Sequence, residues 1–277
     1  MNEQNFDYLK NQLKYTGFGE EMQKDLRAQL GAPTLQPNFT LSHKAEFGSD
    51  KVDVTLHFRK SEQTDLYFFN RYELALTKAN QEQGLKQSFN VGRENNITLK
   101  EGYNLLQGRA IHKELTPKEG EKFQAWLQLN FKETDPNGNF KMKQFHQNYG
   151  FDLQQSLSKF QIAEMVGGDS QQSLIRSLER GNRQSVTMSH EGKEQKMFVE
   201  ANPQFKSINV YDGNFKKVII QSQKEKQVEG QAQSLSEKQI PRETKKEVSK
   251  EKAGKDEDGA AGKKTQRQSS KQKQSLT

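Results

Sequence analysis

The sequence predicts an α+β fold of two small domains with mainly antiparallel sheets, followed by a disordered basic tail. Apolar residues recur at helical spacing near the N-terminus, and most later ones alternate with polar residues as in half-buried strands. Apolar residues then nearly vanish after Ile220. We therefore expect domains at residues 1–80 and 97–220, a linker at residues 81–96 and a tail at residues 221–277.

The first predicted domain begins with two helices, at residues 5–15 and 20–30, where apolar side chains recur every three or four positions. Three strands follow, at residues 39–47, 52–58 and 66–76. The middle strand alternates valine, leucine and phenylalanine with polar residues, so one of its faces should be buried. Two helices before an antiparallel meander are typical of a small α+β unit.

The second predicted domain contains a capped helix at residues 99–107. Thr98 precedes it, and Glu101 stands three residues later, which is the spacing of a capping box. A hairpin is expected next, with strands at residues 123–131 and 139–146 around an Asp-Pro-Asn-Gly turn. The remaining predicted elements are helical segments at 151–160 and 169–180, a hairpin at 185–190 and 193–201 that pairs Val186 with Met197, and strands at 207–211 and 217–220.

The basic character of the chain is concentrated in the tail. Of the 277 residues, 31% are apolar, below the ~45–50% typical of soluble domains. The tail has 14 Lys and Arg against 9 Asp and Glu, a net charge of +5, so the first 220 residues carry only +2 of the total +7. It also contains no aromatic residue. Such a segment buries too little apolar surface to offset its conformational entropy.

Several classes of protein are not expected. Cysteine is absent, which excludes disulfides, thiolate metal sites and cysteine nucleophiles. No apolar run approaches the ~18–20 residues of a membrane span, and the first residues do not resemble a signal peptide. We therefore expect a cytoplasmic protein without membrane contact.

The sequence contains no recognisable catalytic signature. The five histidines are scattered, and no pair has the spacing of a metal site. A serine-hydrolase elbow and a phosphate-binding Gly-Lys-Ser/Thr loop are both missing. We therefore expect neither enzymatic activity nor a cofactor or metal.

One face of the predicted 123–146 hairpin is a candidate nucleic-acid site. Trp126 falls on the polar face of its strand, and Phe145 alternates with Lys141 and Lys143 on the same face of the return strand. Lys132 extends this set. Aromatic rings interleaved with lysines can stack bases and neutralise phosphates. The alternative is that a helix covers this face, so that Trp126 belongs to the core.

Two further sets of basic residues have both a functional and an ordinary interpretation. Arg176 and Arg180 could face phosphates from the helix at 169–180. They could equally form a solvated face, because cations are favoured near a helix C-terminus. The tail lysines could add salt-dependent, non-specific affinity for DNA or RNA, or could serve only as a solubilising linker.

Three strings carry a resemblance to a known family. They are YFFNRY at residues 67–72, NITLKEGYNLLQGR at 96–109 and MFVEANPQF at 197–205. Together they resemble an uncharacterised family, classed as domains of unknown function, that is encoded on conjugative transposons and other mobile elements of Bacteroides-type bacteria. The resemblance covers about residues 16–218. It implies a genetic context of DNA processing and transfer, with topoisomerases and relaxases as typical neighbours, and it supplies no catalytic residues.

Two hypotheses follow for function. The first is a non-enzymatic accessory protein of a mobile element that binds nucleic acid or a DNA-processing partner during conjugative transfer or excision. The second is a protein–protein adaptor with no direct nucleic-acid contact. In the second case an aromatic cluster would supply the interface, and its members are Tyr67, Phe68, Phe69 and Tyr72.

Overall fold

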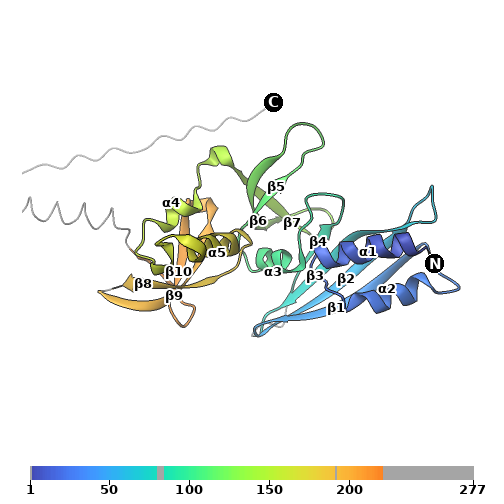
Figure 1. The fold of residues 1–277 in the computed structure, drawn as a ribbon, viewed down its shortest axis with the longest axis horizontal. Coiled ribbons are helices and arrows are strands. Elements are labelled where there is room, and N and C mark those ends of the chain that lie inside the picture. The colour runs from blue at the N-terminus through green and yellow to red at the C-terminus, as the bar shows by residue number, and fades with distance from the viewer. Residues whose placement is uncertain (1, 80–83, 191, 221–277) are drawn as a thin grey trace, which may run out of the picture. The chain divides into compact units, whose positions relative to one another are not determined.

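The computed structural model describes residues 2–79, 84–190 and 192–220 (Figure 1). All of them belong to one compact unit, Met1–Gln231. They form helices and antiparallel sheets, which confirms the predicted α+β class. No helix in this described part is long and apolar enough to cross a membrane. The predicted tail at residues 221–277 lies outside the described residues.

A four-stranded antiparallel sheet in the order β1-β2-β3-β4 forms the N-terminal part of the structure. Two helices cover one of its faces (Figure 1), and their apolar side chains are buried, with Leu9 and Leu26 fully inaccessible. The other face carries polar residues such as Thr55 and His57. These elements are α1 (Glu3–Tyr15), α2 (Met22–Leu30), β1 (Asn38–Phe47), β2 (Asp50–Lys60), β3 (Tyr67–Thr77) and β4 (Leu85–Asn90).

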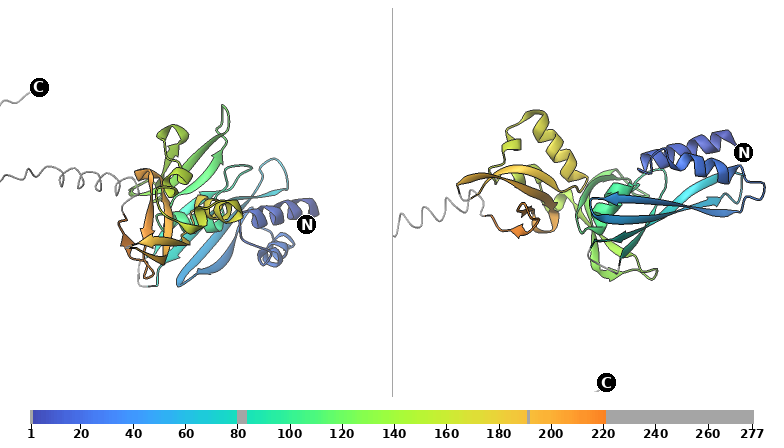
Figure 2. Two further views of the ribbon diagram at one scale, coloured as in Figure 1. Left: turned by 60° about the vertical axis from the view of Figure 1, so that its left-hand side comes forward. Right: turned by 90° about the horizontal axis from the view of Figure 1, so that it is seen from below.

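Two further antiparallel sheets follow, and Figure 2 shows them from two more directions. One is three-stranded, in the order β5-β6-β7, and the other is four-stranded, in the order β11-β10-β9-β8. The α-helices and strands of this part are α3 (Leu99–Leu106), β5 (Ile111–Leu115), β6 (Phe123–Thr134), β7 (Phe140–His146), α4 (Leu153–Leu157), α5 (Gly168–Glu179), β8 (Gln184–His190), β9 (Lys193–Asn202), β10 (Ser207–Tyr211) and β11 (Lys217–Val218). Short 3-10 turns are η1 (Gln147–Tyr149), η2 (Ala163–Met165) and η3 (Pro203–Phe205).

Helix α3 packs closely against the first sheet because Gly102 faces it. A Cβ atom at Gly102 would lie 3.0 Å from the Phe89 ring and 3.1 Å from Tyr72 Oη. The Tyr72 hydroxyl donates a 2.8 Å hydrogen bond to the Ile97 carbonyl, just before the helix. The predicted capping box between Thr98 and Glu101 is present.

The same helix is tied to the turn between α5 and β8 through Asn104, which is fully buried. Asn104 Nδ2 donates to the Arg180 carbonyl at 2.7 Å and to Asn182 Oδ1 at 3.0 Å, and its Oδ1 accepts from Arg109 at 2.8 Å. Between these partners Gly181 has a φ of 78°, and a Cβ atom there would lie 2.8 Å from Ile111. The turn therefore requires glycine for both its conformation and its close approach.

The three-stranded sheet contributes to two hydrophobic cores, one on each face. Ala125, Leu127 and Leu129 of β6 join the core formed by the first sheet and its helices. Trp126 and Phe145 face the other way and join the core of the third sheet with α4 and α5. The predicted division into two domains stays a prediction, because all of these residues belong to one compact unit.

The local predictions succeed where short-range signals are strong. The predicted pairing of Val186 with Met197 is confirmed, while Glu191, which lies between the two predicted strands, is outside the described residues. The helix expected at 151–160 is shorter and spans only Leu153–Leu157, as α4. The chain after it pairs with the edge strand β8, where Ile162 forms a bridge with Met188.

Within the predicted linker at residues 81–96, Leu85–Asn90 forms strand β4 instead. This polar segment is held as a strand partly by the 123–146 hairpin. The buried Gln87 side chain accepts a 2.8 Å hydrogen bond from the Phe140 amide, and the Ser88 amide donates to the Asn139 side chain at 2.8 Å. These partners lie about fifty positions away in the sequence, so local composition does not reveal them.

We expect Gly181→Ala to destabilise the protein more than Gly138→Ala. Both glycines have a positive φ, of 78° and 82°, so both substitutions cost about 1–2 kcal/mol in backbone conformation. Only Gly181 also has neighbours closer than 3.0 Å, which adds an overpacking cost of about 1–3 kcal/mol. Urea unfolding followed by tryptophan fluorescence measures both, and equal losses would contradict the close approach at Gly181.

Candidate nucleic-acid interface

The hairpin of β6 and β7 carries five of the predicted site residues. Trp126 pairs with Phe145 across the hairpin, and Lys143 and Lys141 follow at alternate positions of β7. The register therefore gives these four side chains the shared face that the alternation predicts. Lys132 is exposed and lies in the stretch of β6 where the register shifts, so it belongs to the irregular end of the hairpin.

The two aromatic residues of this face are packed in the second core. Trp126 is 6% exposed and Phe145 is 9% exposed. Phe151 lies edge-on to Trp126 with 5.2 Å between ring centroids, and His112 packs against the indole at 5.0 Å. Rings enclosed in this way offer no open face to a base. The predicted base-stacking role of Trp126 and Phe145 is therefore corrected to packing, which is the alternative in which other elements cover this face.

The lysines of the hairpin remain at the surface. Lys141 Nζ lies 3.2 Å from the Glu133 carboxylate, and both side chains are more than half exposed. Such exposed pairs are worth only about 0–1 kcal/mol, so Lys141 stays available to a stronger anion. Lys143 Nζ lies 3.5 Å from Gln204 Oε1, which brings the hairpin next to the turn η3.

Arg176 and Arg180 belong to a different element, at the C-terminal end of α5. Arg176 donates to the Gln172 side chain at 3.0 Å within the same helix, and its side chain is exposed. Arg180 is also exposed, while its carbonyl accepts the hydrogen bond from Asn104. These contacts fit the ordinary interpretation, a solvated helix face with cations near the C-terminus.

Beside Lys143 the structure assembles a group of side chains that the sequence prediction missed. Tyr149 Oη donates a 2.8 Å hydrogen bond to the Gln204 carbonyl, and Lys206 Nζ lies over the Tyr149 ring, 4.8 Å from its centroid. Tyr149 is 38% exposed and Phe205 is 71% exposed. We call Lys143, Tyr149, Gln204, Phe205 and Lys206 the Tyr149 surface.

Two tight turns bring these side chains together. Gly150, with a φ of 78°, directly follows η1, and Lys206, with a φ of 50°, directly follows η3. Tyr149 also packs on the Phe145 ring with 5.0 Å between centroids, so the second core supports the surface from below. Glycine and proline beside an aromatic residue and a lysine are the signals in the sequence that could have indicated it.

The Tyr149 surface is cationic. Within the part of the chain that the structure describes, no carboxylate forms an ion pair with Lys143 or Lys206. Lys143 contacts the amide oxygen of Gln204, and Lys206 contacts the aromatic ring of Tyr149. A cation over an exposed ring is held by only about 0.5–1 kcal/mol, so a phosphate can draw the Lys206 ammonium away and uncover the ring.

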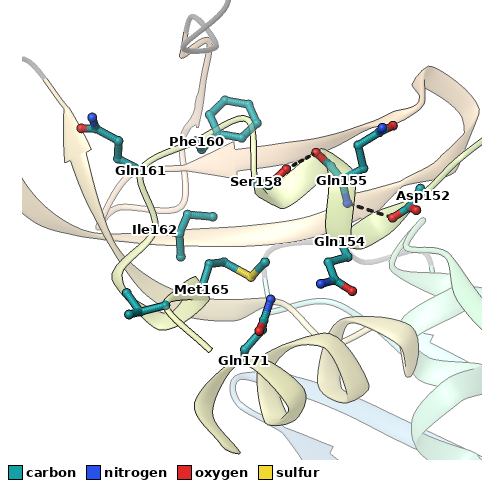
Figure 3. Close-up of a pocket in the computed structure, with 10 residues that line it drawn as sticks. Asp152, Gln154, Gln155, Ser158, Phe160, Gln161, Ile162, Met165 and Gln171 are labelled. Atoms are coloured by element: carbon teal, nitrogen blue, oxygen red, sulfur yellow. Dashed lines mark hydrogen bonds between the residues drawn. The ribbon is translucent and has the colours of Figure 1, made fainter. Parts of the chain in front are cut away.

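A separate pocket of about 580 Å³ lies among α4, η2 and α5 (Figure 3). Its wall consists mostly of glutamine amides and apolar side chains, including Met165 and Ile162. The one charged residue of its lining is Asp152, whose carboxylate already caps α4 by accepting a hydrogen bond from the Gln155 amide at 2.8 Å. This pocket has no cation in its lining to hold a phosphate.

The aromatic cluster expected to serve an adaptor is mostly core. Tyr67, Phe69 and Tyr72 are at most 5% exposed, whereas Phe68 is 39% exposed and lies edge-on to Tyr8, which is 42% exposed. Of the four predicted aromatic residues, only Phe68 is therefore exposed enough to contact a partner protein. Tyr8, which the sequence prediction did not include, lies beside it.

Comparison of the chain with protein-family models, curated proteins and solved structures finds no match. The resemblance to the mobile-element family therefore stays a prediction. Among the described residues no group of three or more histidine, aspartate or glutamate side chains could hold a metal ion.

The environment of Trp126 includes a titratable pair. His112 Nδ1 lies 3.7 Å from the Glu179 carboxylate, and its ring packs on the indole. Burial lowers the pKa of His112, and the negative charge of Glu179 opposes this shift without cancelling it. His112 is therefore neutral at pH 7 and becomes charged only below its ordinary pKa of 6.5.

We expect the fluorescence of Trp126, the only tryptophan, to fall as pH decreases through the pKa of His112. A protonated imidazole quenches an indole in contact with it, and burial places the midpoint below 6.5. A fluorescence titration of the folded protein measures this midpoint. His112→Gln should abolish the step, and a midpoint above 6.5 would mean that Glu179 outweighs burial.

Proposed function

We propose that the chain is a non-enzymatic accessory protein that binds single-stranded nucleic acid at the Tyr149 surface and the adjacent hairpin lysines. One observation carries the proposal: Lys143 and Lys206, which have no carboxylate partner among the described residues, flank the exposed Tyr149. Lysines neutralise phosphates, and aromatic rings stack on bases that are not paired. A duplex offers phosphates but no exposed base faces, so this combination favours a single strand.

The arrangement suggests how the strand would lie. Lys141 and Lys143 are two positions apart on β7, so their side chains follow one another along the same face about 6.6 Å apart. They would contact successive phosphates, and Lys132 would extend this contact toward the end of the hairpin. Beyond Lys143, bases would stack on Phe205, and on Tyr149 once a phosphate has attracted Lys206.

The biological setting of this activity rests on the resemblance. A family encoded on conjugative transposons fits an accessory role during DNA transfer or excision, in contact with DNA-processing proteins of the same element. We further propose that residues 1–80 and 97–220 form two domains with different tasks. The second hydrophobic core supports this division, because all of its members lie within residues 97–220, and the nucleic-acid contact would belong to this second domain. The first core joins the two, since it also takes in residues of α3, β5 and β6.

We expect Lys143→Glu and Lys206→Glu each to weaken binding of single-stranded DNA and RNA and to lower its dependence on salt. Each lost phosphate contact should reduce the slope of log affinity against log salt by about 0.7. Fluorescence anisotropy across a salt series measures this slope. Lys24→Glu, an exposed residue of α2 with the same change of charge, is the matched control. Equal effects of all three variants would indicate only non-specific attraction.

Tyr149→Ala tests the stacking part of the proposal. Loss of one base stack costs about 1–3 kcal/mol, so affinity for single strands should fall about fivefold or more, while the salt slope stays unchanged. Tyr15, an exposed tyrosine at the end of α1, provides the matched control Tyr15→Ala. Tighter binding of duplex DNA than of single strands by the unmodified protein would contradict the proposal.

The second candidate is a protein–protein adaptor, which the exposed pair of Phe68 and Tyr8 favours. An adaptor of this kind would bind a DNA-processing protein through apolar contacts. Its complex should persist at high salt, and Phe68→Ala should abolish it while Lys143→Glu leaves it intact.

A further inference from the structure

A second pocket, of about 460 Å³, opens beside the Tyr149 surface. It lies between the end of the three-stranded sheet and the segments α4 and α5. Its wall includes the aromatic residues Trp126, Phe145 and Phe151 and the polar residues His112, Gln147 and Glu179. Its volume is within the range of about 300–1,000 Å³ typical of small-molecule sites. The aromatic rings of this wall suit a flat heterocycle, and the polar residues, which make up half of the lining, suit the hydrogen-bonding edge of such a ring.

The aromatic residues of this wall pack against one another. Phe151 is edge-on to Trp126, and His112 packs against the same indole. Trp126 and Phe145 are nearly buried, so only a small part of each ring can meet a ligand. A ligand in this pocket would gain shape complementarity from them, and its specificity would come from polar groups.

Two carboxylates line the pocket, and Glu179 is the one placed to give that specificity, because Asp152 already accepts the hydrogen bond that caps α4. The Glu179 side chain is 35% exposed, and its contact with His112 is long, at 3.7 Å. Within the described residues His112 is its only recorded ion-pair or hydrogen-bond partner. Since His112 is neutral at pH 7, the carboxylate keeps acceptor capacity for a ligand. A carboxylate accepts hydrogen bonds from the amino group of a base such as cytosine.

The pocket is next to the place where a strand would bind. Phe145, which forms part of the wall, packs on Tyr149 with 5.0 Å between ring centroids. Gly150, directly after Tyr149, also contributes to the lining. A nucleotide adjacent to one held at Tyr149 would therefore reach the pocket without a break in the strand.

We propose that this pocket receives one unstacked base of the bound strand and that Glu179 selects a base with an amino group over one without. This inference rests on the proposed binding of single strands at the Tyr149 surface. It adds a preference among bases, which the lysines and exposed rings cannot provide because every base has a phosphate and a ring face.

The test compares the affinity of the full chain for homopolymers of cytosine and of thymine with equal length, as DNA and as RNA with uracil in place of thymine. Cytosine has an amino group where thymine and uracil have a carbonyl. We expect the cytosine strands to bind about fivefold more tightly or better. Glu179→Gln should remove this preference, and Glu194→Gln, an exposed glutamate of β9, should keep it.

Trp126 emission provides a second readout that does not depend on affinity. A cytosine base in the pocket should change the emission of this single tryptophan, and Glu179→Gln should reduce the change. A preference for cytosine only in DNA or only in RNA would still support the pocket and would identify the type of strand.

The outcomes separate this inference from the proposed function. Equal affinity for the two bases, with binding that still depends on Lys143 and Lys206, would overturn the pocket inference and leave strand binding intact. A cytosine preference that survives Glu179→Gln would also overturn the assigned role of Glu179. No binding of any strand would overturn both proposals.

Discussion

The close packing of α3 against its neighbours is the constraint on which the rest of the structure depends. Gly102 lets the helix approach the first sheet, and its buried Asn104 is bonded to the turn between α5 and β8. Asn104 uses both amide hydrogens and its oxygen, so loss of any partner would leave a buried polar group unsatisfied. Gly181 completes the junction because any side chain there would collide with Ile111. One short helix thereby connects the first sheet to a turn that lies 76 positions after Asn104 in the sequence.

This junction explains why the three-stranded sheet is buried on both faces near Trp126. The first core takes one face, and α4, α5 and the third sheet take the other. A strand that serves two cores must have apolar residues at adjacent positions, as Ala125, Trp126 and Leu127 do. The tryptophan that breaks the alternating pattern is thus a member of the second core. Farther along the same face the cover ends, and Lys143 and Lys141 reach the surface.

The sequence predicts features that depend on neighbours a few positions away. The capping box of Thr98 and the pairing of Val186 with Met197 are of this kind. It does not predict β4, whose polar side chains are bonded to the distant 123–146 hairpin. The alternation correctly places Trp126 and Phe145 on one face of the hairpin, but both rings are covered there and belong to the second core. Alternation shows that two residues share a face and contains no information about which distant segment covers that face.

The Tyr149 surface is a second feature that short-range sequence patterns could not predict. Tyr149 and Gln204 are 55 positions apart, and only the fold of the second core places them in contact. Each residue alone looks like an ordinary turn residue. The Tyr149 surface is also in contact with the second core. The Tyr149 ring packs on Phe145, and Phe145 pairs with Trp126 across the hairpin. A ligand that shifts Tyr149 would therefore also displace residues of the second core, and Trp126, the single tryptophan of that core, would respond to the displacement as well as to a base in the pocket that it lines.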